Sequence, residues 1–313
     1  MNKITIGLPR ALLYYRYKTL WLEFFKELDV KVVISPKTNK QIIEQGTKYV
    51  VDEACLSLKI FMGHVDYLKD KVDYILVPRI SCLRTNEKVC TNFLALYDLV
   101  CNLFSDSKFL TYNVDVEEKE YEIDGFIKIG KELGFSYITC LNAYKNAKRK
   151  EKEYYKNRVL IQDNKLKENN LKILVIAHQY NLYDDFVGKQ VIKYLEKENI
   201  TVLTSDIYHN NYKEINCNDI SKTLYWTFNK ELMSTACKYK DQIDGIVLIT
   251  TFPCGPDSLS NELIIRKVKS VPILYLTFDN NSSDTGLITR LESFIDIIKI
   301  NEERRTKNEE TFN

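Results

Sequence analysis

The cysteines are the strongest candidates in this chain for residues that bind a metal or take part in a reaction. The clearest is Cys254, in the stretch Thr250–Ser258 (TTFPCGPDS), between a predicted buried strand over residues 245–250 and a predicted helix over 259–269. In open α/β sheets, ligands bind at this edge, and a helix N-terminus there favours a thiolate. The alternative is a cysteine packed in a tight turn, because free cysteine is commonly a small core residue.

Two other cysteines share this context. Cys55 follows Asp52-Glu53-Ala54 and Cys90 precedes Thr91-Asn92, each at the predicted start of a helix. Cys82, just after a predicted strand that begins at residue 74, is an outside candidate. No close C-x-x-C pair is present, which excludes zinc-ribbon and ferredoxin spacings. Cys55, Cys90 and Cys254 would therefore form a site only if the fold assembled them. Thiolates select zinc, copper or iron–sulfur clusters, and three of them leave one coordination position open.

The remaining cysteines give weaker signals. We expect Cys101 and Cys237 to pack in the core, because both lie on apolar helical stripes. Cys140 and Cys217 lie in polar surroundings and stay unassigned. The N-terminus has no secretory apolar region, which predicts a cytoplasmic protein whose eight cysteines do not form disulfides.

Composition excludes several classes of partner. The 313 residues include 45 basic and 43 acidic side chains, for a formal net charge of +2, so neither nucleic acid nor an anionic membrane is indicated. The basic run Lys148-Arg149-Lys150 is interleaved with acids and is typical of a solvated helix face. No apolar run approaches the roughly 18 residues that a membrane helix needs.

Alternating strand and helix patterns predict the elements that would position the cysteines. In the first half, strands are expected over residues 4–8, 31–35, 74–78 and 109–114, and helices over 13–28, 39–45, 55–68, 91–104 and 121–133. In the second half, strands are expected over 172–177, 201–205, 245–250 and 271–277. The intervening helices include 226–239 and 284–300, and another opens at Asp184 and Asp185 with Val187, Val191 and Leu195 inward. Such alternation favours parallel sheets covered on both faces.

Composition also suggests the domain organisation. Residues 144–170 are rich in lysine, glutamate and asparagine, which predicts a solvated helix, a linker and a boundary near residue 168. We therefore expect an N-terminal α/β domain over 1–168 and a C-terminal α/β domain over 169–300, with a cleft between them. Residues 301–313 are charged and are expected to fray. Residues 91–104 are apolar nearly all round, which predicts a buried helix.

Several ordered blocks of the sequence, spread over most of residues 1–300, resemble the acyl-CoA dehydratase activase-related proteins of the 2-hydroxyacyl-CoA dehydratase D-component superfamily. The blocks are Gly7–Tyr15 (GLPRALLYY), Leu20-Trp21, Phe24-Phe25, Val51–Cys55 (VDEAC), Gly63-His64, Val72–Tyr74 (VDY), Val77–Arg79 (VPR), Phe252–Ser258 (FPCGPDS) and Gly286–Asp296 (GLITRLESFID). The resemblance implies two flavodoxin-like domains with a [4Fe-4S] cluster between them, held by Cys55, Cys90 and Cys254.

The chain departs from the family pattern beside two of these cysteines. Ser57 stands where the family usually has proline, and Thr91-Asn92 replaces the proline-lysine pair that usually follows the second cysteine. These changes put the geometry of the helix starts in question more than the ligation. The chain also lacks a glycine-rich phosphate loop, so we do not expect it to be the ATP-hydrolysing activase itself.

Two classes of function remain open. In the first, the protein is an iron–sulfur redox protein, a dehydratase-like lyase or a reductase, that passes one electron to an acyl-CoA-type substrate; the resemblance then implies an ATP-dependent activase as electron donor. In the second, it is a non-catalytic partner or scaffold with a structural metal or none. The oligomeric state, homodimer or heterodimer, is equally open.

Polar residues near the cysteine motifs are candidates for the chemistry. They are His64, Glu53, and the two arginines that follow a strand and a proline, Arg10 and Arg79. Each arginine is as well suited to an ion pair that holds its loop as to a ligand carboxylate or phosphate. Asp257 and Ser258 open a helix directly, and for both we favour helix capping.

Overall fold

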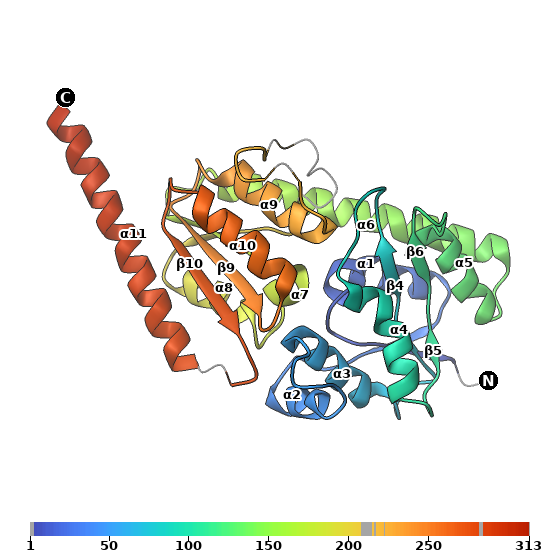
Figure 1. The fold of residues 1–313 in the computed structure, drawn as a ribbon. Helices are drawn as coiled ribbons and strands as arrows, with labels where there is room; N and C mark the ends of the chain where they lie inside the picture. Colours follow the sequence, from blue (N-terminus) through green and yellow to red (C-terminus); the bar gives the residue numbers. More distant parts are fainter. Residues whose placement is uncertain (1–2, 208–214, 216, 222, 282–283, 313) are drawn as a thin grey trace.

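The computed structural model describes residues 3–207, 215, 217–221, 223–281 and 284–312. It has two lobes, each built on a four-stranded parallel sheet with helices around it (Figure 1). The predicted class, α/β with two Rossmann-like parallel-sheet units, is confirmed.

The first lobe has the sheet order β2-β1-β3-β5, with all neighbours parallel. Its strands are β1 (Thr5–Leu8), β2 (Lys31–Ile34), β3 (Tyr74–Leu76) and β5 (Phe109–Leu110). A separate parallel pair, β4 (Arg79–Cys82) with β6 (Asn113–Asp115), continues beyond β3 and β5. The sequence predicted one strand in place of each of these successive pairs. Pro78, which has no N–H to donate, lies at the first interruption.

Helices of the first lobe follow the predicted order. They are α1 (Tyr14–Glu27), α2 (Lys40–Thr47), α3 (Leu56–Leu68), α4 (Thr91–Leu103) and α5 (Glu122–Glu132). α3 is buried along nearly its whole length. α4 is not: it buries only Phe93, Leu96 and Val100 and exposes Leu94 and Leu103. The prediction of a fully buried helix over 91–104 was therefore wrong, and Cys101 on it is only half-buried.

The second lobe has the sheet order β10-β9-β7-β8, again parallel throughout. Its strands are β7 (Lys172–Ile176), β8 (Thr201–Thr204), β9 (Gly245–Thr251) and β10 (Ile273–Phe278). Its helices are α7 (Gln179–Leu182), α8 (Gly188–Lys197), α9 (Thr227–Tyr239), α10 (Gly255–Lys267) and α11 (Asp284–Phe312). Every residue of β9 is buried, because this strand lies inside the sheet and is covered on both faces.

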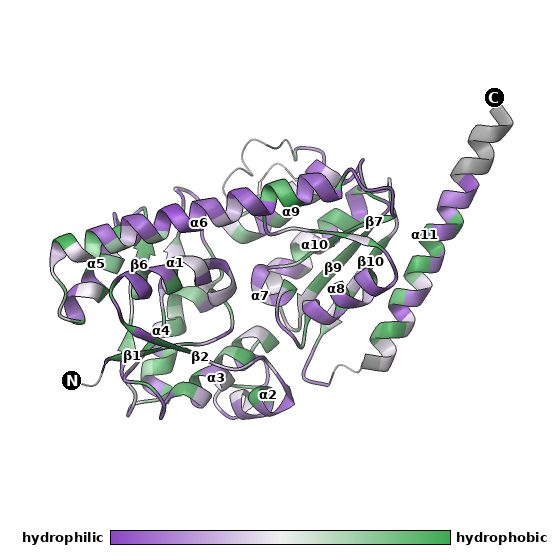
Figure 2. Ribbon diagram, turned by 180° about the vertical axis from the view of Figure 1, so that it is seen from behind, coloured by the Kyte–Doolittle hydropathy of each residue, from purple (hydrophilic) through white to green (hydrophobic). Residues whose placement is uncertain are grey.

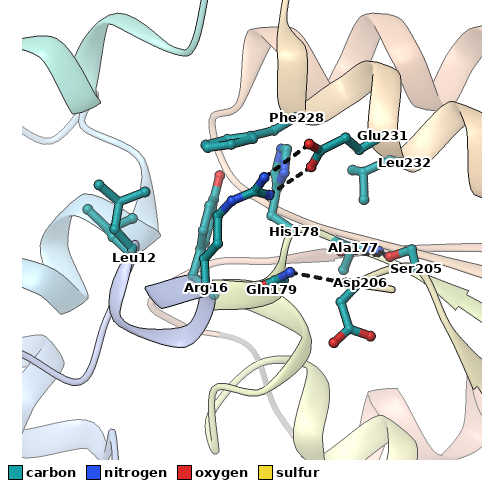
Figure 3. A pocket seen from close by; sticks show the side chains of 12 residues that line it. Leu12, Arg16, Ala177, His178, Gln179, Ser205, Asp206, Phe228, Glu231 and Leu232 are labelled. Atoms are coloured by element: carbon teal, nitrogen blue, oxygen red, sulfur yellow. Dashed lines mark hydrogen bonds and ion pairs between the residues drawn. The ribbon is translucent and has the colours of Figure 1, made fainter. Parts of the chain in front are cut away.

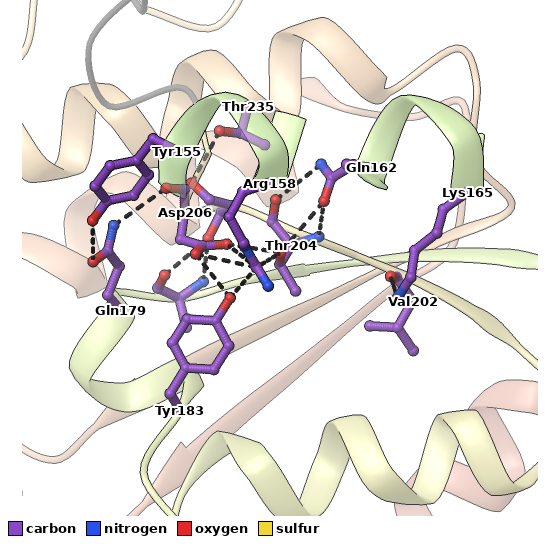
Figure 4. Close-up of polar contacts among 12 residues, drawn as sticks. Tyr155, Arg158, Gln162, Lys165, Gln179, Tyr183, Val202, Thr204, Asp206 and Thr235 are labelled. Carbon is purple, nitrogen blue, oxygen red and sulfur yellow. Dashed lines mark hydrogen bonds and ion pairs between the residues drawn. The ribbon is translucent and has the colours of Figure 1, made fainter. Parts of the chain in front are cut away.

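The stretch predicted as a solvated helix followed by a linker is the later part of one long helix, α6 (Tyr137–Lys165), and the turn residues 166–170 that follow it. In Figure 1 α6 runs beside both lobes, and in Figure 2 it is mostly hydrophilic. Its inner side nevertheless buries Glu151, Tyr155 and Gln162. The side chain of Gln162 bonds to the backbone of Thr204 at the end of β8 (Figure 4). The boundary near residue 168 stays a prediction.

α11 continues to Phe312. The fraying predicted for residues 301–313 stays a prediction. The helix packs on the second lobe through Leu291, Phe294 and Ile298, ahead of that region.

Cys217 and Cys237 form a disulfide, with Cα atoms 5.7 Å apart. The expectation that the cysteines do not form disulfides was therefore wrong for this pair. Cys237 was expected to pack in the core, and Cys217 had no assignment. Their separation of 20 residues gives no sequence signal for the pairing, which arises because the segment before α9 packs back on that helix. Among the helices that the structure describes, none is long and apolar enough to cross a membrane.

Candidate functional site

Three cysteines occupy the residue immediately before a helix. Cys55 precedes α3, Cys90 precedes α4 and Cys254 precedes α10, and none of the three forms a side-chain cap on its own helix. All three line one pocket between the lobes. The structure thus brings together the three residues that the sequence singled out, although their role as ligands stays a prediction.

Backbone hydrogen bonds fix the loops that carry the cysteines. The N–H of Leu56 donates to the carbonyl of Phe252 at 3.0 Å, which joins the Cys55 turn to the Cys254 turn. The N–H of Lys88 donates to the carbonyl of Tyr225 at 3.2 Å, and Lys88 accepts from the N–H of Thr227 at 2.9 Å. Because these bonds connect the two lobes, the pocket is held from both sides.

The departures from the family pattern add polar links at this junction. Ser57 Oγ donates to Asn181 Oδ1 at 2.8 Å and lies 2.9 Å from the hydroxyl of Thr251. Asn92 Nδ2 donates to the sulfur of Cys55 at 3.7 Å. Ser57 and Asn92 therefore tie the helix starts to their surroundings.

The electrostatics of the thiols are dominated by burial. Desolvation raises the pKa of Cys55, Cys90 and Cys254, and the carboxylate of Asp257 raises the pKa of Cys90 and Cys254 further. Each sulfur also accepts a hydrogen bond from a backbone N–H in the first turn of its helix, those of Leu58, Asn92 and Asp257. These N–H groups oppose the effect of burial without overcoming it. Without a positive partner, the three thiols stay protonated at neutral pH.

A buried histidine–aspartate pair adjoins the cysteines. His178 Nε2 lies 2.7 Å from Asp257 Oδ1, and the same carboxylate accepts from Asn229 Nδ2 at 2.9 Å and from Thr250 Oγ1 at 2.8 Å. Burial raises the pKa of Asp257, but His178 and these donors outweigh it and hold the pKa below its usual range. The capping role predicted for Asp257 was wrong, since its side chain points to these partners and not to its own helix. Ser258 Oγ likewise donates back to the carbonyl of Cys254.

A second cavity adjoins the cysteine pocket and shares His178, Tyr180, Phe228 and Leu12 with it (Figure 3). It lies at the carboxyl ends of β7 and β8, where Ala177, Ser205 and Asp206 line it. Its far side is formed by the ion pair of Arg16 and Glu231, with nitrogen–oxygen distances of 2.7 and 3.1 Å. The cysteines therefore lie on one side of these shared residues and the ion pair on the other.

Comparison with known families decides the relationship. A model of the family described as CoA enzyme activase uncharacterised domain matches residues 5–208. The chain belongs to this family. The match to the CoA enzyme activase domain includes Cys55, Cys90 and His178 but ends before Cys254.

Other comparisons are less informative. No curated protein matches the chain. Among solved structures, the SBP FpvC from Pseudomonas aeruginosa in complex with Mn2+ has a TM-score of 0.31 and 10% identity, with 97% of this chain and 100% of FpvC covered. The Cd-bound periplasmic metal binding protein from Candidatus Liberibacter asiaticus has a TM-score of 0.29 and 12% identity, with 94% and 99% covered. Likenesses at this level carry no argument about function.

The predicted arginines lie outside the lining of the cysteine pocket. Arg79 pairs with Asp98 on α4 at 2.5 Å. This agrees with the alternative in which the arginine forms an ion pair within the protein and does not bind a ligand. The backbone N–H of Arg10 donates to the hydroxyl of Ser35 at 2.7 Å. Its buried Nε has no hydrogen-bond partner among the described residues.

The other sequence candidates are also elsewhere. His64 is fully buried on α3 and lies 3.0 Å from the hydroxyl of Thr38, and Glu53 is exposed. Cys82 lies beside Asp115 and Glu117, but the ammonium group of Lys88 already pairs with both carboxylates. Neither His64, Glu53 nor Cys82 lines the cysteine pocket.

Sequence reasoning missed His178 and Tyr180. A signal was available, because His178 follows β7 in the same way that Cys254 follows β9, at the carboxyl edge of one sheet.

Proposed function

We propose that Cys55, Cys90 and Cys254 bind an iron–sulfur cluster of the [4Fe-4S] type and that the protein is a one-electron redox component of an activase–dehydratase system. The observation that carries this proposal is that three cysteines from three helix starts line one pocket. Membership of the CoA enzyme activase domain family supports the link to such a system.

The charges around the pocket fit a cationic metal centre. Asp257 is held below its usual pKa and is therefore ionised, while burial raises the pKa of all three thiols. Three thiolates beside this carboxylate would be costly in a buried site unless positive charge compensated them. Iron supplies such charge, and the backbone N–H bonds to the sulfurs are the type of contact that stabilises and tunes a cluster.

The residues of the chain have distinct parts in this proposal. The three thiolates would hold the cluster, which when bound supplies one-electron transfer. Phe93, Phe228 and Trp226 line the pocket and exclude water. The substrate class that we propose is an acyl-CoA-type thioester, and the electron donor is a separate ATP-dependent activase.

Anaerobic purification followed by iron and acid-labile sulfide analysis tests the proposal. We expect a brown protein that contains both elements. Cys55→Ala, Cys90→Ala and Cys254→Ala should each lose most of the iron, because each removes one of three ligands. Cys101→Ala is the matched control, since Cys101 is a half-buried free cysteine that does not line the pocket. Zinc or no metal in the wild type would instead support a scaffold with a structural metal or none.

A further inference from the structure

A groove of about 460 Å³ lies beside α6, where this helix passes from the first lobe to the second. Its walls come from both lobes, because residues of α1, α5, α6, α9 and the loop after β4 line it. Among the described residues, it shares none with the cysteine pocket, and it shares only Arg16 and Glu231 with the cavity of Figure 3. A cavity of this size is in the range that holds a small-molecule ligand.

The carboxylates that line this groove are paired with cations that also line it. Glu231 accepts from Arg16 at 2.7 and 3.1 Å. The ammonium group of Lys148 lies 2.7 Å from Glu122 and 2.6 Å from Glu151. Since each of the three carboxylates already has a cation, the groove is poorly suited to a cationic ligand.

Positive charge is in excess in the groove. Its lining has three carboxylates and four cations, which are Arg16, Arg84, Lys148 and Lys152. Lys152 follows Lys148 by four residues, so the two side chains lie on the same face of α6. Lys152 is exposed and forms no ion pair with any other described residue, whereas Lys148, Lys150 and Arg158 of the same helix each form one.

Arg84 brings a further cation from a different wall, the loop after β4. Burial raises the pKa of Glu231, and the charges of Arg16 and Arg84 oppose this rise, so Arg84 lies near that ion pair. The groove thus has cations on α6 and on a loop of the first lobe. This arrangement favours an anion that is bound from more than one side.

The types of side chain indicate the class of anion. Arginine and lysine are the residues that bind phosphate groups, whose oxygens accept hydrogen bonds from several directions. The groove is larger than a phosphate group needs, and Tyr17, Leu83 and Tyr155 line it beside the cations. It therefore has room for an organic part of the ligand, which these three side chains would contact.

We propose that this groove binds an organic phosphate, with the phosphate group held by Arg84, Lys148 and Lys152 and the organic part against Tyr17 and Tyr155. The site is separate from the cysteines, so it goes beyond the proposed function and does not depend on the cluster.

Calorimetry on the full-length protein tests the proposal with three probes: phenyl phosphate, inorganic phosphate and benzyl alcohol. We expect phenyl phosphate to bind most tightly, because it has both the charge and the ring. Lys152→Met should weaken its binding about three- to tenfold, as the loss of one exposed charge-assisted contact predicts. Lys152→Arg, which keeps the charge, should bind nearly as well as the wild type. Since Lys152 is exposed, both variants should fold.

Lys150→Met is the matched control, because Lys150 is an exposed lysine of α6 that pairs with Glu153 and does not line the groove. It should bind phenyl phosphate like the wild type. The proposal is overturned if the wild type does not bind phenyl phosphate, or if Lys150→Met and Lys152→Met weaken binding equally, as unspecific attraction to a charged helix would. Inorganic phosphate or benzyl alcohol binding as tightly as phenyl phosphate would likewise overturn the assignment of an organic phosphate.

Discussion

Two buried ionisable residues contact the hydroxyl of Thr38 and have opposite pH dependences. Burial raises the pKa of Asp184 to about 6, although Thr38 and the backbone N–H of Phe186 donate to its carboxylate. Burial, with a smaller effect of Arg10, lowers the pKa of His64 to about 3. Both residues are therefore neutral in the folded protein at pH 5.

The sign of each contribution follows from the protons bound. Between its unfolded pKa of 3.8 and about 6, folded Asp184 holds more protons than the unfolded chain, so stability falls as pH rises. Between about 3 and its unfolded value of 6.5, His64 holds fewer, so stability rises with pH. From about pH 4 to pH 6 the two effects oppose each other in the wild type.

Asp184→Asn should separate them. Without the carboxyl group, the free energy of unfolding of the variant, relative to wild type, should increase by about 2 kcal/mol between pH 4 and pH 6, which is most of the roughly 3 kcal/mol expected for the full shift of about two pKa units. Urea unfolding at several pH values measures it. Parallel stability curves for the two proteins would show that Asp184 does not titrate in this window.

At the residue scale, sequence pattern located the cysteines but not their neighbours. Cys55, Cys90 and Cys254 could be singled out from the sequence because each precedes a predicted helix. The partnership of His178 with Asp257 spans 79 residues and depends on the packing of β7 against β9, which no local pattern encodes.

At the scale of an element, α6 also has contacts that local sequence pattern does not encode. Its composition is that of a solvated helix, yet Arg158 on it lies beside the buried carboxylate of Asp206 at 3.1 Å (Figure 4). Tyr183 and Thr204 also donate to this carboxylate. Polar residues that pair in the interior look like surface residues in sequence, so helix and strand alternation was predictable and the burial of α6 was not.

Arg158→Ala should therefore destabilise the protein although the helix looks exposed. We expect a loss of about 2–3 kcal/mol, below the 3–5 kcal/mol of a fully buried pair because the arginine is partly exposed and Asp206 keeps other donors. Lys150→Ala, which removes an exposed pair with Glu153 on the same helix, should cost less than about 0.5 kcal/mol. Equal urea midpoints for the two variants would show that the Arg158–Asp206 pair on α6 stabilises the protein no more than an exposed ion pair does.

At the scale of the whole molecule, the two lobes share one apolar core. The core that includes Ile6 and Phe24 of the first lobe continues to Ile173, Val247 and Phe294 of the second. The sequence predicted two α/β domains with a cleft between them, but a change of composition shows only where the chain is polar and not which surfaces meet. We therefore expect a single cooperative unfolding transition for both lobes.

The Arg16–Glu231 ion pair tests this coupling most directly, because it joins α1 of the first lobe to α9 of the second. Its side chains are only 13% and 6% exposed, and Arg16 also lies over the ring of Phe228 at 4.7 Å. Arg16→Met alone should cost about 3–5 kcal/mol, since it leaves Glu231 buried without its cation. Arg16→Met combined with Glu231→Leu should recover most of that loss, because no charge then remains buried.

The measurement is a double-mutant cycle of urea unfolding, in which one fluorescent probe in each lobe monitors the transition. If the lobes are coupled as the shared core indicates, both probes should report the same midpoint in the wild type and in every variant, and the midpoint of Arg16→Met should fall for both together. A fall seen only by the second-lobe probe would mean that the ion pair stabilises α9 locally and that the lobes unfold independently. A double variant no more stable than Arg16→Met would show that the loss comes from packing around the guanidinium and not from the unpaired carboxylate.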